Sequence, residues 1–498
     1  MKNILIIGGG LGGLFTGALL SKEGYTVTVL EKNHIIGGGL QCFKYRNVSF
    51  ETGMHILGGF YKGGTLYKIC SYLGIMDKLR IMDTDEHAMD SITYGEDGKT
   101  YTLPRGKEAF TQYLQSKFPK ESTNIQRFMD AMYQIANEVD LFYLRSNNHN
   151  NYSHSEDFFM PIDEFISKYV TDLTLRDILA YMNPMYGGIE GHTPAFIHAM
   201  INVLYIEGSS QFVDGSQQLA DNLSKIITDH GGKIIAGDAV KHINVVEKKV
   251  EGVITDKGIR HTAELYISSV HPNILFQLVS DNAFPHYYVK RISSIPNSYS
   301  AFSVYIKFKP DSQLYVNHPR YFQERYGSVW HLGDYNEDIF PQGFMYITPP
   351  TQHQGKWAKR MIVNCIMPFE VVRKWENTTV GHRGADYICW KEKMKDQVLK
   401  KIEILHPGFN DTIEWSFASS PLTIRDYFGS KEGALYGHVC DCNNLMLSQM
   451  PIGTKIKNLL LTGQNVNLHG ICGVPLTAIE TAEAIVGKNV ILEKINKQ

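Results

Sequence analysis

The sequence predicts an α/β fold in which a parallel sheet with a β-meander forms one domain and a mixed α+β domain is inserted into it. Three observations support this prediction. The chain opens with a strand–helix–strand pattern, several strand-like runs follow residue 231, and a last apolar strand and helix lie near the C-terminus. With 498 residues the chain is long enough for two or three domains. The first domain should therefore combine segments that are far apart in sequence.

The first 30 residues are typical of one βαβ unit. The run from Asn3 to Ile7 is mostly apolar and β-branched, as in a strand that is buried on both faces. Small and apolar residues from Leu14 to Lys22 predict a helix, and Tyr25–Leu30 predicts the next strand. A strand, a helix and a strand of these lengths form a right-handed unit that opens a parallel sheet.

A glycine motif joins the first strand to the first helix. Gly8, Gly10 and Gly13 have the spacing GxGxxG, and Glu31 follows 18 residues later (31 − 13) at the end of the second strand. This context predicts a Rossmann-type dinucleotide site, in which the glycines permit a tight turn, close approach of a pyrophosphate and close helix packing. The helix N-terminus favours phosphate, and Glu31 accepts ribose hydroxyls but repels a 2′-phosphate, which argues against NADP. A purely structural turn is the alternative.

A second glycine cluster favours FAD over NAD. Gly37–Gly39 follows the Glu31 strand, where a flavoprotein must lead the chain past the rest of an extended dinucleotide. A second GxGxxG motif is missing, so a nicotinamide domain of the glutathione-reductase type is not expected. We therefore predict FAD as the cofactor. The remaining residues assigned to its site are Gly12, Lys32, Gly38 and Gly39.

The rest of the chain alternates between helical and strand-like patterns. Residues 106–170 have a helical pattern, interrupted by the polar stretch Ser146–Asn151, a candidate loop or lid. The expected meander strands are 233–235, 240–246, 250–255 and 265–270, those of another sheet are 300–307, 345–348 and 361–367, and the last strand and helix are 459–463 and 475–486.

These patterns divide the chain into two discontinuous domains. We expect residues 1–80, 205–290 and 425–498 to form the FAD-binding domain. Residues 81–204 and 291–424 are then expected to form a substrate-binding domain with a helical lid region.

Sequence blocks at both ends and in the middle of the chain carry a family resemblance. They are Lys2–Glu31, Gly37–Gly39, Phe50–His55, Gly208–Ser216, Ser420–Thr423, Gly433–Gly437, Leu461–Asn465 and Gly470–Pro475. Together they resemble the superfamily of FAD proteins that contains phytoene desaturases, carotenoid isomerases and retinol saturases, and the C-terminal blocks are most similar to the last two. Residues 290–415 carry none of it. The resemblance implies redox chemistry on a polyene-like substrate.

The resemblance also implies roles for single residues. Gly463 corresponds to a backbone contact with the ribityl-phosphate part of FAD, and Gln464 stands where many relatives have Asp. Gly473 and Val474, expected to start the last helix, correspond to the stretch under the pyrimidine edge of the flavin, where a helix N-terminus stabilises negative charge. Val240 corresponds to the residue whose backbone holds the adenine.

Catalytic candidates are few, because a flavin carries the hydride itself. His55, and Glu51 in the same block, are the titratable residues that we expect near the flavin. For both, a structural role is an equal alternative to a role in proton transfer. A G-x-S-x-G nucleophile motif in a strand–turn–helix setting is missing.

Composition excludes several classes of protein. Lys plus Arg is 49 against 51 for Asp plus Glu, which gives no sign of a nucleic-acid partner. Seven scattered Cys predict reduced thiols in a cytoplasmic protein, with metal binding improbable. Glycines interrupt the apolar N-terminus, against a signal peptide, and no apolar run is long enough to span a bilayer.

Three functions remain open at this point. The favoured one is an FAD-dependent oxidoreductase that acts on C=C bonds of a hydrophobic isoprenoid or polyene. Saturase or isomerase activity is favoured over desaturase activity. A flavin amine oxidase is the second, and a non-catalytic prenyl-binding protein like the Rab GDP-dissociation inhibitors is the third. The expected partners of the first are a hydrophobic small molecule and an external electron donor or acceptor (quinone, oxygen or a reductase), with peripheral membrane contact left open.

Overall fold

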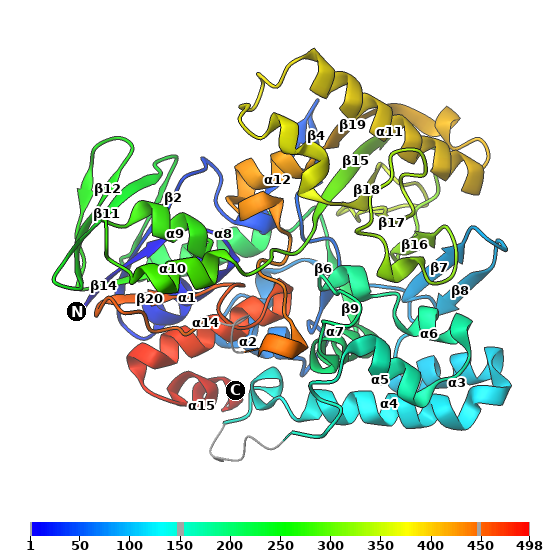
Figure 1. The fold of residues 1–498 in the computed structure, drawn as a ribbon, viewed down its shortest axis with the longest axis horizontal. Coiled ribbons are helices and arrows are strands. Elements are labelled where there is room, and N and C mark those ends of the chain that lie inside the picture. Colours follow the sequence, from blue (N-terminus) through cyan, green and yellow to red (C-terminus); the bar gives the residue numbers. More distant parts are fainter. Residues whose placement is uncertain (1, 147–153, 446–449, 498) are drawn as a thin grey trace.

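The computed structural model describes residues 2–146, 154–445 and 450–497. Two large sheets lie side by side, one with helices on both sides and one with a long helix across its outer face (Figure 1). A group of helices lies below the second sheet in the same view. The parallel sheet plus a separate mixed sheet confirms the predicted fold class.

The first sheet has five parallel strands in the order β10-β2-β1-β14-β20. Alternate residues of β1 reach two different cores. Ile4 and Ile6 pack toward α1, α8 and α14, whereas Leu5 and Ile7 pack toward β11 (Val240–Val246), β12 (Lys249–Thr255) and α9 (Pro272–Leu278). Burial on both faces explains the apolar run. The bounds are β10 Lys233–Ala236, β2 Thr26–Glu31, β1 Asn3–Ile7, β14 Leu265–Ser268, β20 Leu459–Leu461, α1 Leu11–Lys22, α8 Gln217–Asp229 and α14 Gly470–Val486.

The β-meander is smaller than predicted. It contains β11 Val240–Val246, β12 Lys249–Thr255 and the short β13 Arg260–His261. The assignment of 233–235 and 265–270 to the meander is wrong, because these runs form β10 and β14 of the parallel sheet. The short spacing between these runs suggested a meander. A strand of a parallel sheet is reached through a crossover connection, and for β10 that connection is α8, which precedes all four runs in the sequence.

The second sheet has seven strands in the order β19-β15-β18-β17-β16-β7-β8. Only the β16–β7 pair is parallel among these strands. The helix α11 (Ala385–Leu405) packs on one face through Met394, Val398 and Ile402. The bounds are β19 Ile413–Ser419, β15 Ser300–Phe308, β18 Arg360–Met367, β17 Gly343–Ile347, β16 Arg320–Gln323, β7 Asp90–Tyr94 and β8 Thr100–Leu103.

The predicted helical stretch after residue 106 is helical. In α4 the buried side chains Ile125, Phe128, Met129 and Met132 form one apolar face. Residues 147–151 of the predicted loop lie outside the described residues. The helices are α3 Lys107–Lys117, α4 Ser122–Asn137, α5 Ile162–Tyr169, α6 Leu173–Leu179 and α7 Ala195–Glu207.

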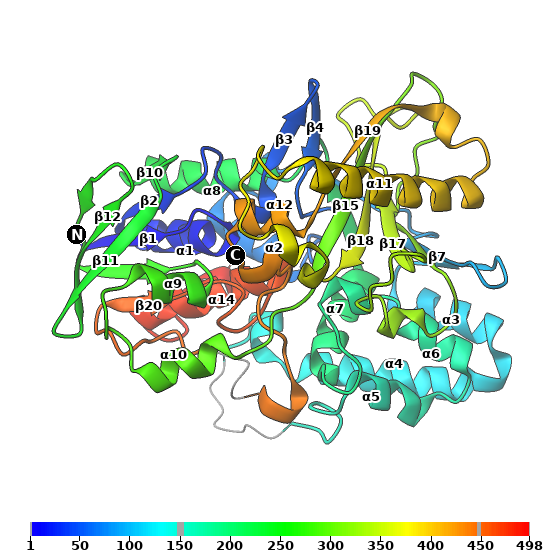
Figure 2. The ribbon, with the colours of Figure 1, turned by 45° about the horizontal axis from the view of Figure 1, so that its top comes forward.

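A short hairpin, β3 (Cys42–Tyr45) and β4 (Val48–Glu51), stands beside the second sheet (Figure 2). The ring of Phe50 in β4 packs edge-on against Tyr305 of β15, with 5.4 Å between the ring centroids. This contact joins the N-terminal segment to the second sheet. The remaining elements are β5 Leu57–Gly58, β9 Ser209–Phe212, β6 Ile81–Asp83, α2 Thr65–Leu73, α9 Pro272–Leu278, α10 His286–Ser293, α12 Pro421–Phe428 and α15 Val490–Asn496.

In the described ranges, helices are too short or too polar to cross a membrane. The described residues also hold no group of three His, Cys, Asp or Glu side chains that could bind a metal ion.

Candidate functional site

The glycine motif forms a tight turn between β1 and α1. Gly8 has φ +102°, a conformation that favours glycine, and a Cβ atom added to Gly13 would lie 2.0 Å from the carbonyl oxygen of Gly8. At Gly10 the added Cβ would meet nothing nearer than the Cα atom of Gly38, at 4.0 Å. Gly8 and Gly13 therefore serve the turn and the packing, whereas Gly10 leaves open space in front of the helix N-terminus.

The second glycine cluster faces the first. The N–H group of Gly37 donates a hydrogen bond to the carbonyl oxygen of Gly9 at 2.7 Å. A Cβ atom added to Gly38 would lie 3.2 Å from the Cα atom of Gly10. Backbone alone thus lines the space between the two clusters. We call the backbone around Gly8–Gly13 and Gly37–Gly39 the glycine cradle.

Glu31 supports the glycine cradle from the end of β2. Its carboxylate is buried and accepts hydrogen bonds from the N–H groups of Gly9, at 2.7 Å, and Asn33, at 2.8 Å. Each carboxylate oxygen has a second lone pair, so the group retains acceptor capacity for a ribose hydroxyl. Lys32, assigned to the same site, instead donates to the carbonyl oxygen of Asp426 at 2.6 Å, at the end of α12.

Further glycines continue the backbone-lined path toward the second sheet. Gly463, with φ +93°, follows β20, and its Cα atom would lie 2.9 Å from a Cβ atom on Gly12. A Cβ atom on Gly53 would lie 3.4 Å from the carbonyl oxygen of Gly39. The path therefore runs along the carboxyl ends of the parallel strands, where ligands of such sheets bind.

The path ends in a cavity of about 1310 Å³, counted out to its mouth. This volume includes open space at the mouth, so the lining residues rather than the volume indicate which ligand fits. The residues that line it come from segments far apart in the sequence and are Thr52–Ile56, Tyr181, Pro184, Met185, Tyr205, Ala301, Ser303, Tyr321–Gln323, Leu332, Gly343–Met345, Asn364–Ile366, Ile424, Phe428, Leu435, Tyr436, Gln464, Gly470 and Ile471.

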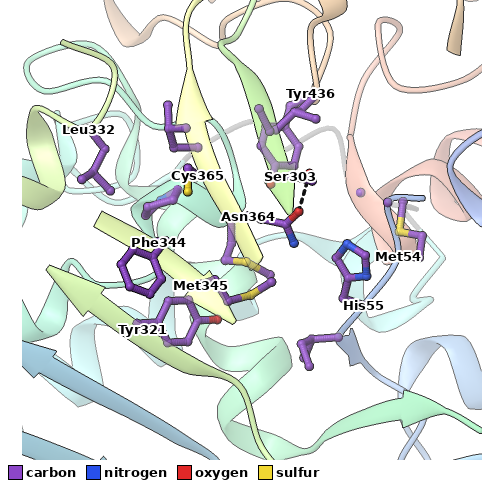
Figure 3. A pocket seen from close by; sticks show the side chains of 18 of the residues that line it. Met54, His55, Ser303, Tyr321, Leu332, Phe344, Met345, Asn364, Cys365 and Tyr436 are labelled. Atoms are coloured by element: carbon purple, nitrogen blue, oxygen red, sulfur yellow. Dashed lines mark hydrogen bonds between the residues drawn. The ribbon is translucent and has the colours of Figure 1, made fainter. Parts of the chain in front are cut away.

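The chemistry of the lining is mostly apolar. Within the described part of the chain, no Asp, Glu, Lys or Arg lines the cavity. The groups that can hydrogen-bond from the wall include the His55 ring, the Asn364 amide and the Tyr321 hydroxyl, whose side chains Figure 3 shows among apolar neighbours. Such a wall suits a long neutral ligand and does not suit a charged one.

His55 and Glu51, the catalytic candidates, lie together. The Nδ1 atom of His55 is 3.3 Å from Glu51 Oε2, and both side chains are buried. His55 lines the cavity, whereas Glu51 lies behind it. The hydrogen bond fixes the ring and leaves Nε2 without a partner among the described residues. The geometry is that of an oriented histidine, and its role stays a prediction.

The last helix begins earlier than predicted. α14 starts at Gly470 rather than at Gly473 or Pro475, so Pro475 lies inside its first turns. Gly470 and Ile471 line the cavity, whereas a Cβ atom on Gly473 would lie 2.7 Å from Leu468 Cβ, which makes Gly473 a packing position. Pro475 is the sixth residue of α14, beyond the four N–H groups that lack an intrahelical acceptor, so it removes one backbone hydrogen bond to the carbonyl oxygen of Ile471.

Val240 and Val474 lie on opposite faces of the parallel sheet. Val240 opens β11, outside the parallel sheet, and packs against the core beneath the meander. Val474 is buried in α14, and its Cγ1 atom would lie 3.4 Å from a Cβ atom on Gly12. Their predicted contacts with adenine and pyrimidine stay predictions.

Sequence reasoning missed the side chains on the second sheet. Ser303, Asn364 and Tyr321 lie on three different strands, and only strand pairing brings them to one wall. It also missed Asp90, which is buried behind this wall and accepts a hydrogen bond from the Tyr181 hydroxyl at 2.5 Å. Burial raises the pKa of Asp90 to about 8. No local motif marks any of these residues.

The described residues fit a flavin dinucleotide. A Cβ atom on Gly10 would enter open space at the N-terminus of α1, as required if that space holds phosphate. The backbone path past Gly12 and Gly463 leads on to the cavity, whose wall includes the N-terminus of α14 at Gly470 and Ile471. One end of the path thus suits a diphosphate, and the other suits a flat ring.

Comparison with known proteins bears on the fold and the family. The family model "NAD(P)-binding Rossmann-like domain" matches residues 6–73. All-trans-retinol 13,14-reductase of Danio rerio is 24% identical over an alignment that covers 98% of this chain and 86% of that protein. The 1-hydroxycarotenoid 3,4-desaturase of Flavobacterium sp. (strain P99-3) is 23% identical, with coverage of 98% and 100%. These findings confirm the resemblance to the superfamily of FAD-dependent oxidoreductases.

Solved structures share the fold. An oxidoreductase from Methanosarcina mazei superposes with a TM-score of 0.67 at 16% identity, covering 97% of this chain and 100% of that one. Wild-type putrescine oxidase bound to putrescine has a TM-score of 0.65 at 13% identity, covering 100% and 99%. At these identities the likeness shows the fold alone.

Proposed function

We propose that this chain is an FAD-dependent oxidoreductase that acts on C=C bonds of a long, apolar, conjugated substrate, with saturation or isomerisation favoured over desaturation. The observation that carries the proposal is the cavity, which is mostly apolar, has no charged Asp, Glu, Lys or Arg in its described wall, and begins where the glycine cradle leads. Full-length similarity to a retinol reductase and a carotenoid desaturase supports the same substrate class.

In this proposal the glycine cradle holds the FAD diphosphate. Gly10 and the facing Gly38 leave the space, Glu31 accepts from the ribose, and Gln464 contacts the ribityl chain. The bound flavin supplies hydride transfer. The proposed cofactor segments are 1–80, 205–290 and 425–498, and the proposed substrate segments are 81–204 and 291–424.

The protein's own contribution is to bind, to exclude water and to move protons. Apolar wall residues such as Met345 and Ile366 keep the substrate out of water. Glu51 holds His55 by Nδ1, so that a proton can be carried at His55 Nε2. Saturation of one C=C bond requires one proton in addition to the hydride, and isomerisation requires no net proton.

The electron partner is proposed from what the sequence contains. With one GxGxxG motif in the chain, electrons would come from or leave to an external quinone, oxygen or reductase rather than a nicotinamide bound in the same chain. A cytoplasmic protein with peripheral membrane contact would reach a lipid-dissolved substrate.

The proposal is tested with flavin-loaded protein that has been reduced under anaerobic conditions. All-trans-retinol or a carotenoid is added in deuterated water, and the product mass is read. A product that has gained two hydrogen atoms, counted as deuterium where they come from the solvent, identifies a saturase, and an unchanged composition with altered geometry identifies an isomerase. A product two hydrogens lighter, formed only by the oxidised enzyme, identifies a desaturase and contradicts the favoured direction. A flavin that responds to amines and to no polyene contradicts the proposal as a whole.

The amine oxidases share the fold but not the chemistry that we infer for this wall. A diamine carries positive charge that a site must offset with a carboxylate or an aromatic cage. The described wall has no carboxylate, but seven aromatic side chains line it, so the amine arm of the test above decides between the two chemistries. A prenyl-binding protein without FAD would have no need of the open glycine cradle, and a colourless protein would revive that alternative.

A further inference from the structure

One row of side chains crosses the wall of the second sheet. The strand register places Ser303 of β15 beside Asn364 of β18, Asn364 beside Met345 of β17, and Met345 beside Tyr321 of β16. All four line the cavity. We call these four residues the cavity row. Three of its members are polar, although most other cavity residues are apolar.

Asn364 is the central polar member of the cavity row. Ser303 Oγ donates a hydrogen bond to Asn364 Oδ1 at 2.7 Å, which turns the amide nitrogen away from Ser303. In Figure 3 the amide oxygen faces Ser303 and the amide nitrogen points away from it. The amide nitrogen has no acceptor among the described residues. Asn364 therefore presents a fixed N–H donor to whatever occupies the cavity.

An unpaired donor in a mostly apolar cavity favours a ligand with an acceptor. Leaving such a donor without a partner costs free energy, and polar groups placed in apolar sites fix the orientation of the ligand. The Tyr321 hydroxyl, also without a protein partner in the described chain, is a second donor in the same row. Because no Lys or Arg lines the wall, a carboxylate would be buried without a counter-ion. The acceptor is therefore a neutral oxygen.

We propose that Asn364, oriented by Ser303, binds a hydroxyl or carbonyl oxygen of the substrate and so sets which C=C bond lies beside His55. The inference rests on the proposed function and narrows its substrate class from any polyene to an oxygen-bearing one. Asn364 and His55 both line the cavity, so an oxygen held by Asn364 fixes how far along the substrate the bond beside His55 lies. A hydrocarbon of the same length would lack this anchor and bind in several registers.

The test compares two ligands that differ by one oxygen atom. All-trans-retinol and the hydrocarbon in which its CH₂OH group is replaced by CH₃ are titrated into oxidised, flavin-loaded protein, and dissociation constants are measured from polyene absorbance. We expect the wild type to bind the alcohol about tenfold more tightly, as one or two hydrogen bonds predict. Asn364→Leu, similar in volume, should bind both ligands within about twofold of each other, with flavin content unchanged.

Two further variants keep the test decisive. Ser303→Ala frees the Asn364 amide to rotate and should reduce the preference for the alcohol without abolishing it. This variant replaces Asn364→Leu in the test if Asn364→Leu does not fold. Met345→Leu, the apolar neighbour in the cavity row, should change both affinities by the same factor. Preference for the alcohol that survives in Asn364→Leu overturns the inference, as does equal binding by the wild type. Failure of both ligands to bind the wild type overturns the proposed function and this inference with it.

Discussion

The glycine cradle and the cavity row line neighbouring parts of one site with different atoms. Around Gly10 and Gly38 the wall is backbone, and an added Cβ atom enters the binding space itself. At Asn364 and Tyr321 the wall is side chain, carried by strands that form a stable sheet whichever residue they present. A substitution at a glycine of the cradle adds side-chain atoms, so it should either unfold the protein or prevent cofactor binding. Substitutions on the second sheet should change preference or pH dependence while the fold remains.

The largest expected effect is in the glycine cradle. Gly13→Ala places a Cβ atom 2.0 Å from the carbonyl oxygen of Gly8, so the β1–α1 turn must open. We expect a loss of more than about 4 kcal/mol of unfolding free energy, or no folded protein. Gly355→Ala is the control, because its Cβ atom would meet no atom within 4 Å. Denaturant midpoints check both, and a wild-type midpoint for Gly13→Ala would contradict the turn geometry.

The second-largest effect is expected at Asp90, behind the cavity wall, where the substitution should raise the unfolding free energy rather than lower it. The pKa of Asp90 rises from 3.8 to about 8 through burial, so between these values the unfolded chain releases a proton that the native state keeps. Stability should therefore fall as pH rises from about 4 to 8 and level off above. Asp90→Asn, which retains an acceptor for Tyr181, should remove this trend and stabilise the protein at pH 8 by several kcal/mol.

The control for Asp90 is Asp311→Asn, since Asp311 is exposed. Unfolding free energies at several pH values between 4 and 8 provide the comparison. Parallel pH curves for wild type and Asp90→Asn would show that Asp90 is ionised in the native state. The inference that Asp90 is buried in its uncharged form would then be wrong.

The smallest of these effects concerns the support of the glycine cradle. Glu31→Gln keeps one acceptor oxygen, but its NH₂ group faces one of the two N–H groups of Gly9 and Asn33. We expect a loss of about 2 kcal/mol and weaker retention of flavin on dilution. Glu264→Gln is matched to it, because Glu264 accepts a long bond of 3.4 Å at the surface. Equal flavin retention by the two variants would show that Glu31 does not contribute to cofactor binding.

The two regions also differ in how far sequence alone predicted them. The motif Gly8, Gly10 and Gly13 with Glu31 lies within one βαβ unit, so local spacing carried both its structure and its proposed ligand. Asn364 and Ser303 are 61 residues apart and meet only because β15 pairs with β18. A lone Asn in an apolar strand gives no signal until the register is known.

The two errors in the fold have different origins. The runs 233–235 and 265–270 were assigned to a local meander, but they join the parallel sheet through partners more than 200 residues away, as β14 does with β1. The start of α14 at Gly470 was missed for a local reason, because Gly473 and Pro475 suggested a helix boundary, whereas Pro475 lies inside the helix.

The central claim is that backbone at the glycine cradle holds FAD, and Gly10→Val tests it most directly. The flavin content of the purified variant is measured by absorbance and by release of FAD after heat denaturation, with circular dichroism as the check on folding. The account predicts that the wild type and Gly355→Ala carry FAD, and that Gly10→Val is folded and colourless, because its side chain fills the space in front of α1. A folded Gly10→Val that retains the wild-type amount of FAD would contradict it.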